Sequence, residues 1–204
     1  MSMTNHSKPD KTGASHTDSE LIDRYEIRFS GSGGQGLILA GVMLAEAVAT
    51  IDGKNCVQTQ SYGPEARGGA SRADVVISSG EIYYPKPMQL DLLLALSQEA
   101  CDNYYHDLRE DGLLIVDSHL VTQVPTSRCI GIPFSQLARH EIGNTMVANV
   151  ISLGAICAIS GVVSEAGLIE VVKRRAPRGT EEKNLAALQL GLVEGKKAKD
   201  RIRL

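Results

Sequence analysis

The sequence contains no tryptophan, and aromatic residues make up only 4% of its 204 residues. All-β sandwiches rely on aromatic and β-branched residues, whereas glycine, alanine, leucine, isoleucine and valine dominate this chain. Such residues suit closely packed layers of helices on a sheet. A basic surplus is also lacking, because the formal net charge is −3, and binding nucleic-acid phosphates needs a basic face. The sequence therefore favours an α/β fold and gives no reason to expect a nucleic-acid partner.

The four cysteines form no metal-binding motif. Cys56, Cys101, Cys129 and Cys157 lie far apart, with no Cys-x-x-Cys pair and no histidine at ligand spacing. Zinc and iron–sulfur sites need closely spaced ligands, so we expect no metal site and interpret these cysteines as small buried hydrophobic residues. The N-terminus also lacks the apolar segment of a secretory signal, which predicts a cytoplasmic protein.

A membrane-spanning segment is not expected either. Residues 145–163 form a run of 19 residues without charge, which approaches the length of a membrane span. Asn149, Ser152, Gly154, Ser160 and Gly161 lower its hydrophobicity. Small residues at close spacing let two helix backbones approach each other, so the run predicts a buried helix in a core or an interface.

The chain divides into a polar N-terminal segment and one domain. Residues 1–22 carry few apolar side chains, which is typical of disorder. We predict a single domain over residues 23–204, a length that buries its own core. The patterns predict strands at 25–30, 56–60, 71–78, 90–96, 113–117 and 128–132, helices at 36–50 and 98–109, and three helical stretches from about residue 135 onward, with a final helix beginning after Thr180.

Strands joined by helical crossovers imply a mostly parallel, Rossmann-like twisted sheet with helices on both faces. The apolar runs at 92–94 and 113–116 are continuous rather than alternating, as expected for central strands. Ser79 and Gly80 separate the predicted strand 71–78 from a short run at 81–84. This arrangement predicts a hairpin that adds an antiparallel edge to the sheet.

A glycine cluster follows the first predicted strand and precedes the first predicted helix. It reads GSGGQG and contains the candidate site residues Gly31, Gly33, Gly34, Gln35 and Gly36. In this context the helix N-terminus can receive an anion, or the glycines can serve close packing of helix on strand. A dinucleotide site would also need an acidic residue at the end of the second strand, where residues 58 and 60 are glutamines. A nicotinamide cofactor is therefore disfavoured.

A second loop, QSYGPEARGG at residues 60–69, combines turn-forming residues with charge. A Gly-Pro pair imposes a tight turn, and two further glycines permit close backbone approach. The acid and the guanidinium in this loop can form a surface ion pair of little energetic value. A loop fixed in one shape instead favours a grip on a ligand or partner. Its candidate binding residues are Ser61, Tyr62, Gly63, Pro64, Glu65, Arg67, Gly68 and Gly69.

No catalytic constellation is evident in the sequence. Asp117, Ser118 and His119 have the residue types of a hydrolase triad, but three consecutive residues cannot converge in triad geometry. They are interpreted as the end of a strand. His106 and His140 are interpreted as surface residues, and we expect no catalytic residue in this chain.

The two glycine loops together resemble those of the gamma subunit of 2-oxoacid:ferredoxin (or other acceptor) oxidoreductases. The similarity extends over nearly the whole predicted domain and includes the run at 71–78, Tyr84-Pro85, Asp91, Asp117 and Asn184. The loop sequence SYGPEARGG is most similar to that of family members in the branch that acts on 2-oxoglutarate. The resemblance implies a Rossmann-like gamma domain in a cytoplasmic hetero-oligomer.

The resemblance also implies a division of labour among subunits. The complex oxidatively decarboxylates a 2-oxoacid onto coenzyme A and passes electrons to ferredoxin. Thiamine diphosphate with Mg²⁺ is expected in the alpha and beta subunits, and iron–sulfur clusters in the beta or a ferredoxin-like delta subunit. This chain is expected to bind no cofactor alone, to complete the assembly, and to use its glycine loops on coenzyme A or on the alpha subunit. The alternative is an independent coenzyme A- or nucleotide-binding domain.

Overall fold

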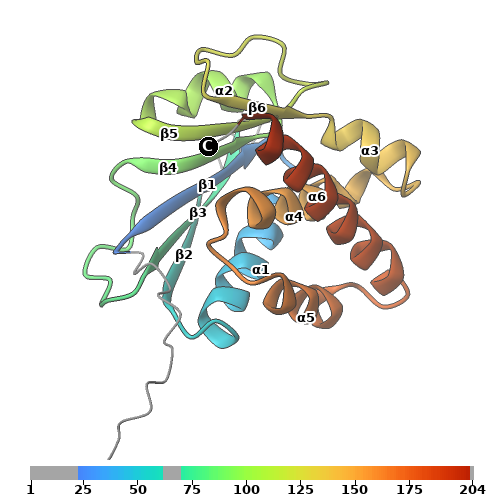
Figure 1. The fold of residues 1–204 in the computed structure, drawn as a ribbon, viewed down its shortest axis with the longest axis horizontal. Helices are drawn as coiled ribbons and strands as arrows, with labels where there is room; N and C mark the ends of the chain where they lie inside the picture. The colour runs from blue at the N-terminus through green and yellow to red at the C-terminus, as the bar shows by residue number, and fades with distance from the viewer. Residues whose placement is uncertain (1–22, 62–69, 203–204) are drawn as a thin grey trace, which may run out of the picture.

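A central twisted sheet organises the chain, seen here in a computed structural model that describes residues 23–61 and 70–202. Within these residues the sheet has six strands in the order β2-β3-β1-β4-β5-β6 (Figure 1). The strands are β1 Tyr25–Gly31, β2 Asn55–Ser61, β3 Ser71–Ser78, β4 Leu90–Ala95, β5 Leu108–Asp117 and β6 Cys129–Ile132. The helices are α1 Leu37–Thr50, α2 Gln98–Tyr104, α3 Phe134–His140, α4 Ala148–Ser160, α5 Glu165–Arg175 and α6 Glu181–Ile202, with 3-10 turns η1 Tyr105–Asp107 and η2 Thr145–Val147.

The strand directions confirm a mostly parallel sheet with an antiparallel part at one edge. β1, β4, β5 and β6 pair in parallel, whereas β3 is antiparallel to both of its neighbours, β1 and β2. The predicted pairing of 71–78 with 81–84 is wrong, because both sides of β3 are occupied and residues 81–84 form no strand.

Hydrogen bonds from β1 and the residue before it fix the segment after β3 in an irregular shape. The Arg24 guanidinium donates to the carbonyl oxygens of Tyr84 and Lys86 at 3.0 and 3.1 Å. The Glu26 carboxylate accepts the backbone N–H groups of Met88 and Gln89 at 2.7 and 2.9 Å. Prolines at 85 and 87 remove two backbone donors that a strand would need.

The predicted helix at 98–109 ends early. α2 stops at Tyr104, and β5 begins at Leu108, five residues before the strand predicted from Leu113. β5 begins early because Leu108 pairs with Leu90 of β4. A register shift separates this pair from the regular pairing, which starts with Leu92 and Leu113. Gly112 allows this, since a Cβ there would lie 2.8 Å from the Leu108 side chain and 2.9 Å from a backbone oxygen of β4.

Helices cover the sheet unequally. α1, α4, α5 and α6 lie on one face, whereas α2 lies on the other (Figure 1). The larger core cluster joins the first face to these helices, and a smaller cluster packs Ala100 and Cys101 of α2 against β4 and β5. Along β1, Ile27 and Phe29 point into the larger core. The expected helices on both faces are thus present.

The uncharged run at 145–163 forms η2 and the buried helix α4, as the sequence predicts. None of the helices in the described part of the chain combines the length and apolar character needed to cross a membrane. α4 instead lies in the core, where ten of its residues are buried.

Glycines bring α4 and α6 into backbone contact. A Cβ at Gly191 would overlap the carbonyl oxygen of Ile151, and a Cβ at Gly154 would overlap that of Leu188. At Gly195 the added atom would lie 2.8 Å from the Ala155 backbone. The nearest obstacles are backbone atoms, which cannot rotate away. This contact therefore requires glycine and fixes the distance between the two helices.

We expect Gly191→Ala to lower the free energy of unfolding by about 1–3 kcal/mol, because the new methyl group overpacks the contact between α4 and α6. Chemical denaturation followed by circular dichroism measures this. Gly80→Ala is the matched control, since its Cβ would meet one atom at 3.9 Å. Equal stability of both variants would contradict the proposed helix contact.

Candidate functional site

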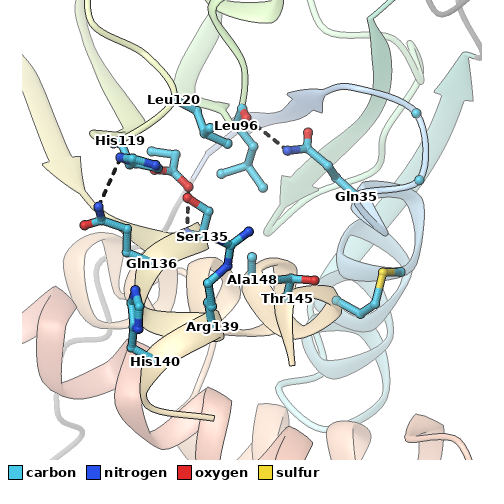
Figure 2. A pocket seen from close by; sticks show the side chains of 14 residues that line it. Gln35, Leu96, His119, Leu120, Ser135, Gln136, Arg139, His140, Thr145 and Ala148 are labelled. Carbon is cyan, nitrogen blue, oxygen red and sulfur yellow. Dashed lines mark hydrogen bonds between the residues drawn. The ribbon is translucent and has the colours of Figure 1, made fainter. Parts of the chain in front are cut away.

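A cavity of about 610 Å³ opens at the carboxyl ends of the parallel strands. From β1 the chain enters α1 on one face, and from β4 it enters α2 on the other. A crevice at such a switch point is where open α/β sheets bind ligands. The cavity lies beside this point and is lined by Gly33, Gly34, Gln35, Leu96, Asp117, His119, Leu120, Ser135, Gln136, Arg139, His140, Thr145, Met146 and Ala148 (Figure 2).

Gln35 fixes the glycine loop against β4. Its side-chain oxygen accepts the backbone N–H of Ser32 at 2.7 Å, and its Nε2 donates to the carbonyl oxygen of Leu96 at 3.0 Å (Figure 2). A Cβ at Gly31 would overlap that side-chain oxygen. Gly31 is therefore needed for the Gln35 bridge, which closes the switch point between β1 and β4.

Asn149 at the start of α4 holds the other end of the loop. Its Nδ2 donates to the carbonyl oxygen of Gly36 at 2.9 Å. Gly36 is the N-cap of α1 and has φ 71°, in the left-handed region, and a Cβ there would lie 2.5 Å from Asn149 Nδ2. Gly36 is thus required twice, for its backbone conformation and for the close approach of α4.

The sequence left the glycine loop open between an anion cradle and close packing, and the structure divides these roles among the glycines. Gly31 and Gly36 serve packing, as shown by the contacts of Gln35 and Asn149. Gly33 and Gly34 instead line the cavity, and a Cβ at either would meet nothing within 4 Å. Ligand binding by this loop stays a prediction.

The second candidate loop is described only at its start. Ser61 ends β2 and lines a separate cavity on the other side of the sheet, so it is not brought together with the first glycine loop in one cavity. Residues 62–69 lie outside the described residues. The binding role predicted for them stays a prediction.

One wall of the cavity, which carries the guanidinium of Arg139, was not predicted and comes from α3 and from the turn after β5. Arg139 extends from α3 toward the middle of the cavity, and His119 lies close to Gln136, with 3.1 Å between Nδ1 and Nε2 (Figure 2). His140 follows Arg139 on the same wall. The sequence signal available was the convergence of parallel strand ends, which brings the residues after Asp117 near the glycine loop.

Asp117 is the one carboxylate in the described lining, and both its oxygens are engaged. The residue is 1% exposed. It accepts the backbone N–H of His119 at 2.9 Å and that of Ser135, in the first turn of α3, at 2.7 Å. This agrees with its interpretation as a strand end rather than a triad member. Asp117 therefore anchors the start of α3. Among the described residues that line the cavity, no other carboxylate is present to pair with Arg139.

The strand order adds a second argument against dinucleotide binding in the usual manner. A Rossmann dinucleotide site reads the ribose with an acid on the strand next to the glycine loop. Here β3 lies between β1 and β2. Gln58 and Gln60 of β2 are therefore one strand removed from the loop, in addition to lacking a carboxylate.

The cysteines are free thiols with little tendency to ionise. Cys101 and Cys157 are buried, and Cys56 and Cys129 are half-buried. Burial raises the pKa of Cys56 and of Cys157 to about 12, and that of Cys129 to about 11. Over residues 23–61 and 70–202, no three His, Cys, Asp or Glu side chains gather closely enough to hold a metal ion.

Comparison with known proteins identifies the family of this chain. The protein family described as pyruvate ferredoxin/flavodoxin oxidoreductase matches residues 26–194. The chain belongs to this family. The resemblance to its gamma subunits is confirmed by a relative from Methanocaldococcus jannaschii, 2-oxoglutarate synthase subunit KorC, which is 48% identical over 172 residues, covering 82% of this chain and 92% of the relative.

Two solved structures of family proteins share the fold. The keto/oxoacid ferredoxin oxidoreductase gamma subunit from Geobacter sulfurreducens has a TM-score of 0.79 and 48% identity, with 86% of this chain and 98% of that chain covered. The 2-oxoglutarate:ferredoxin oxidoreductase from Magnetococcus marinus, solved with 2-oxoglutarate, coenzyme A and succinyl-CoA bound, has a TM-score of 0.76 and 25% identity. The match covers 86% of this chain and 31% of that longer one.

We expect Gly36→Ala to destabilise the protein by about 1–3 kcal/mol, the order of cost for a non-glycine residue in the left-handed region. The methyl group would also press on Asn149. Gly33→Ala is the control within the same loop, because it faces open space. Thermal unfolding of the two variants checks this, and a loss of stability in Gly33→Ala equal to that in Gly36→Ala would contradict the division of roles.

Proposed function

We propose that this chain is the gamma subunit of a 2-oxoglutarate:ferredoxin oxidoreductase complex. The observation that carries the proposal is its 48% identity, over 82% of this chain and 92% of the relative, to a subunit named for 2-oxoglutarate. The complex would form succinyl-CoA from 2-oxoglutarate and coenzyme A in the cytoplasm, with ferredoxin as electron acceptor. Thiamine diphosphate, Mg²⁺ and iron–sulfur clusters would be held by the alpha, beta and delta subunits.

Within this complex the chain would assist binding and assembly rather than perform covalent chemistry. The cavity described above offers a guanidinium, two imidazoles and the N-terminus of α1 for anionic groups. It also offers apolar surface from Leu96, Leu120 and Met146. Its volume lies within the range of small-molecule sites, roughly 300–1,000 Å³.

Coenzyme A combines these two requirements in one molecule. Its nucleotide end carries phosphates beside a flat adenine ring, whereas its pantetheine arm is uncharged. We infer that the cavity holds the nucleotide end, with Arg139 on a phosphate and the apolar residues against the adenine. Held in this way, the nucleotide would direct the thiol arm out of this chain toward the partner subunits, where the acyl group is formed.

We expect Arg139→Gln to weaken coenzyme A binding at least tenfold. A charge-assisted hydrogen bond contributes about 1.5–3 kcal/mol, and about 1.4 kcal/mol corresponds to a factor of ten. Isothermal titration calorimetry on the purified chain measures it. Arg128→Gln, an exposed arginine outside the cavity lining, is the matched control. Adenosine 3′,5′-bisphosphate should compete and pantetheine should not, whereas equal affinities of both variants and wild type would contradict the assignment.

The purified chain alone should not oxidise 2-oxoglutarate, because the proposal places the reacting centres in other subunits. Turnover is measured with coenzyme A and an artificial electron acceptor, first on the isolated chain and then after addition of the remaining subunits. Activity should require both this chain and the remaining subunits. Turnover by the isolated chain, free of contaminating subunits, would instead support an independent enzyme. Coenzyme A binding without any association with the remaining subunits would support an independent binding domain.

A further inference from the structure

The second face of the sheet is covered by α2 beside β4 but has no helix over β2 and β3 within the described residues (Figure 1). Since Ile27 and Phe29 face the larger core, the alternate residue Arg28 points to this second face. Across β3 and β2, Asp74 pairs with Arg28 and Thr59 pairs with Asp74 in register. This half of the sheet is antiparallel, and in the described part of the chain its second face carries no helix.

A buried ionic network lies on this uncovered half. The side chain of Arg28 is 5% exposed and bonds Asp74 through Nε at 2.6 Å and Nη2 at 3.1 Å, and it also bonds Asp107. Burial alone would lower the pKa of Arg28, but its bonds to the two carboxylates raise the pKa above its usual value. Arg28 and Arg72 both lie against the Tyr104 ring, with guanidinium carbons 5.0 and 5.5 Å from its centre.

A cavity of about 310 Å³ opens over this network with an excess of positive charge. Arg28, Arg72 and Lys86 line it, against the single lining carboxylate of Asp74. Both oxygens of that carboxylate are bonded to Arg28, and Arg72 approaches it no closer than 3.9 Å. Among the described residues, no acid forms a closer ion pair with Arg72 or any ion pair with Lys86. The cavity therefore fits an incoming carboxylate.

The segment that contributes Tyr84, Lys86 and Pro87 to the cavity wall also carries exposed apolar side chains. Tyr83 is 88% exposed and Met88 is 67% exposed, while Tyr84 contributes to the cavity wall. The bonds from Arg24 and Glu26 described above hold the backbone of this segment. Tyrosine, methionine and arginine are enriched at protein interfaces, and a pre-ordered loop loses little entropy on binding.

We propose that this face, defined by Arg72, Lys86, Tyr83, Tyr84 and Met88, docks a neighbouring subunit that inserts an aspartate or glutamate side chain between Arg72 and Lys86. The proposal rests on the proposed function, since it takes the neighbour from the same complex. It adds a place and a chemistry for the contact. The docking face lies across the sheet from the larger core and is lined by none of the residues of the cavity assigned to coenzyme A.

The test measures the dissociation constant between the purified chain and the remaining subunits of the complex, prepared without it. Lys86→Glu should raise this constant at least tenfold, and Tyr83→Ala should also raise it. Lys86→Arg should bind nearly as well as wild type, because it keeps the charge. Lys173→Glu on α5 is the matched control, since it is exposed and lies on the helical side of the sheet. Melting temperatures should be unchanged in all four variants, because all three of the substituted side chains are exposed.

Several outcomes would overturn the docking proposal. One is wild-type association by Lys86→Glu and Tyr83→Ala. Another is a loss of association in the control Lys173→Glu as large as that in Lys86→Glu. A Lys86-dependent binding of succinate or phosphate without any effect on association would assign the cavity to a free anion. A Lys86-dependent dimer in sedimentation would assign the cavity to a second copy of this chain.

The coenzyme A affinity of Lys86→Glu should match wild type. Failure of the coenzyme A cavity and failure of this face therefore give different results, whereas no association by wild type would overturn both the subunit assignment and this face.

Discussion

The backbone contact between α4 and α6 is the constraint on which the rest of the structure depends. Gly154, Gly191 and Gly195 leave no space between the two helices, so their relative position is fixed by backbone rather than by adjustable side chains. α4 also carries Asn149, whose amide holds the carbonyl of Gly36. The shape of the glycine loop is thus set from the helical layer as well as from the sheet, where Gln35 bonds Leu96.

Much of this arrangement could be predicted from the sequence, because it depends on local patterns. The uncharged run at 145–163 and its small residues predicted a buried helix in close contact with another, and both are present. The mostly parallel pairing followed from the helices predicted between successive strands, and the central strands followed from their continuous apolar runs. The glycine cluster predicted either an anion cradle or close packing of helix on strand. It did not indicate which glycine packs and which faces the cavity, since that depends on contacts with Gln35 and Asn149.

The remaining features depend on contacts between distant segments. The hairpin predicted at 71–84 failed because β2 and β1 occupy both edges of β3, and no local turn signal reports such competition. Arg139 and His119 were not recognised as cavity residues, because α3 and the turn after β5 meet the glycine loop only in the folded chain. The ionic network around Arg28 likewise joins β1, β3 and η1, which are tens of residues apart in the sequence.

The late position of α6 in the chain has a consequence for synthesis. Proteins emerge from the ribosome with the N-terminus first, at roughly 5–20 residues per second. α4 has thirteen residues and is complete at Ser160, but its glycine surface meets its partner only when Leu188 to Gly195 have emerged. During that interval the apolar surface of α4 lacks the helix that covers it in the folded protein. The helical layer can therefore close only after α6 has been synthesised, and until then the surface of α4 remains available for non-native contacts.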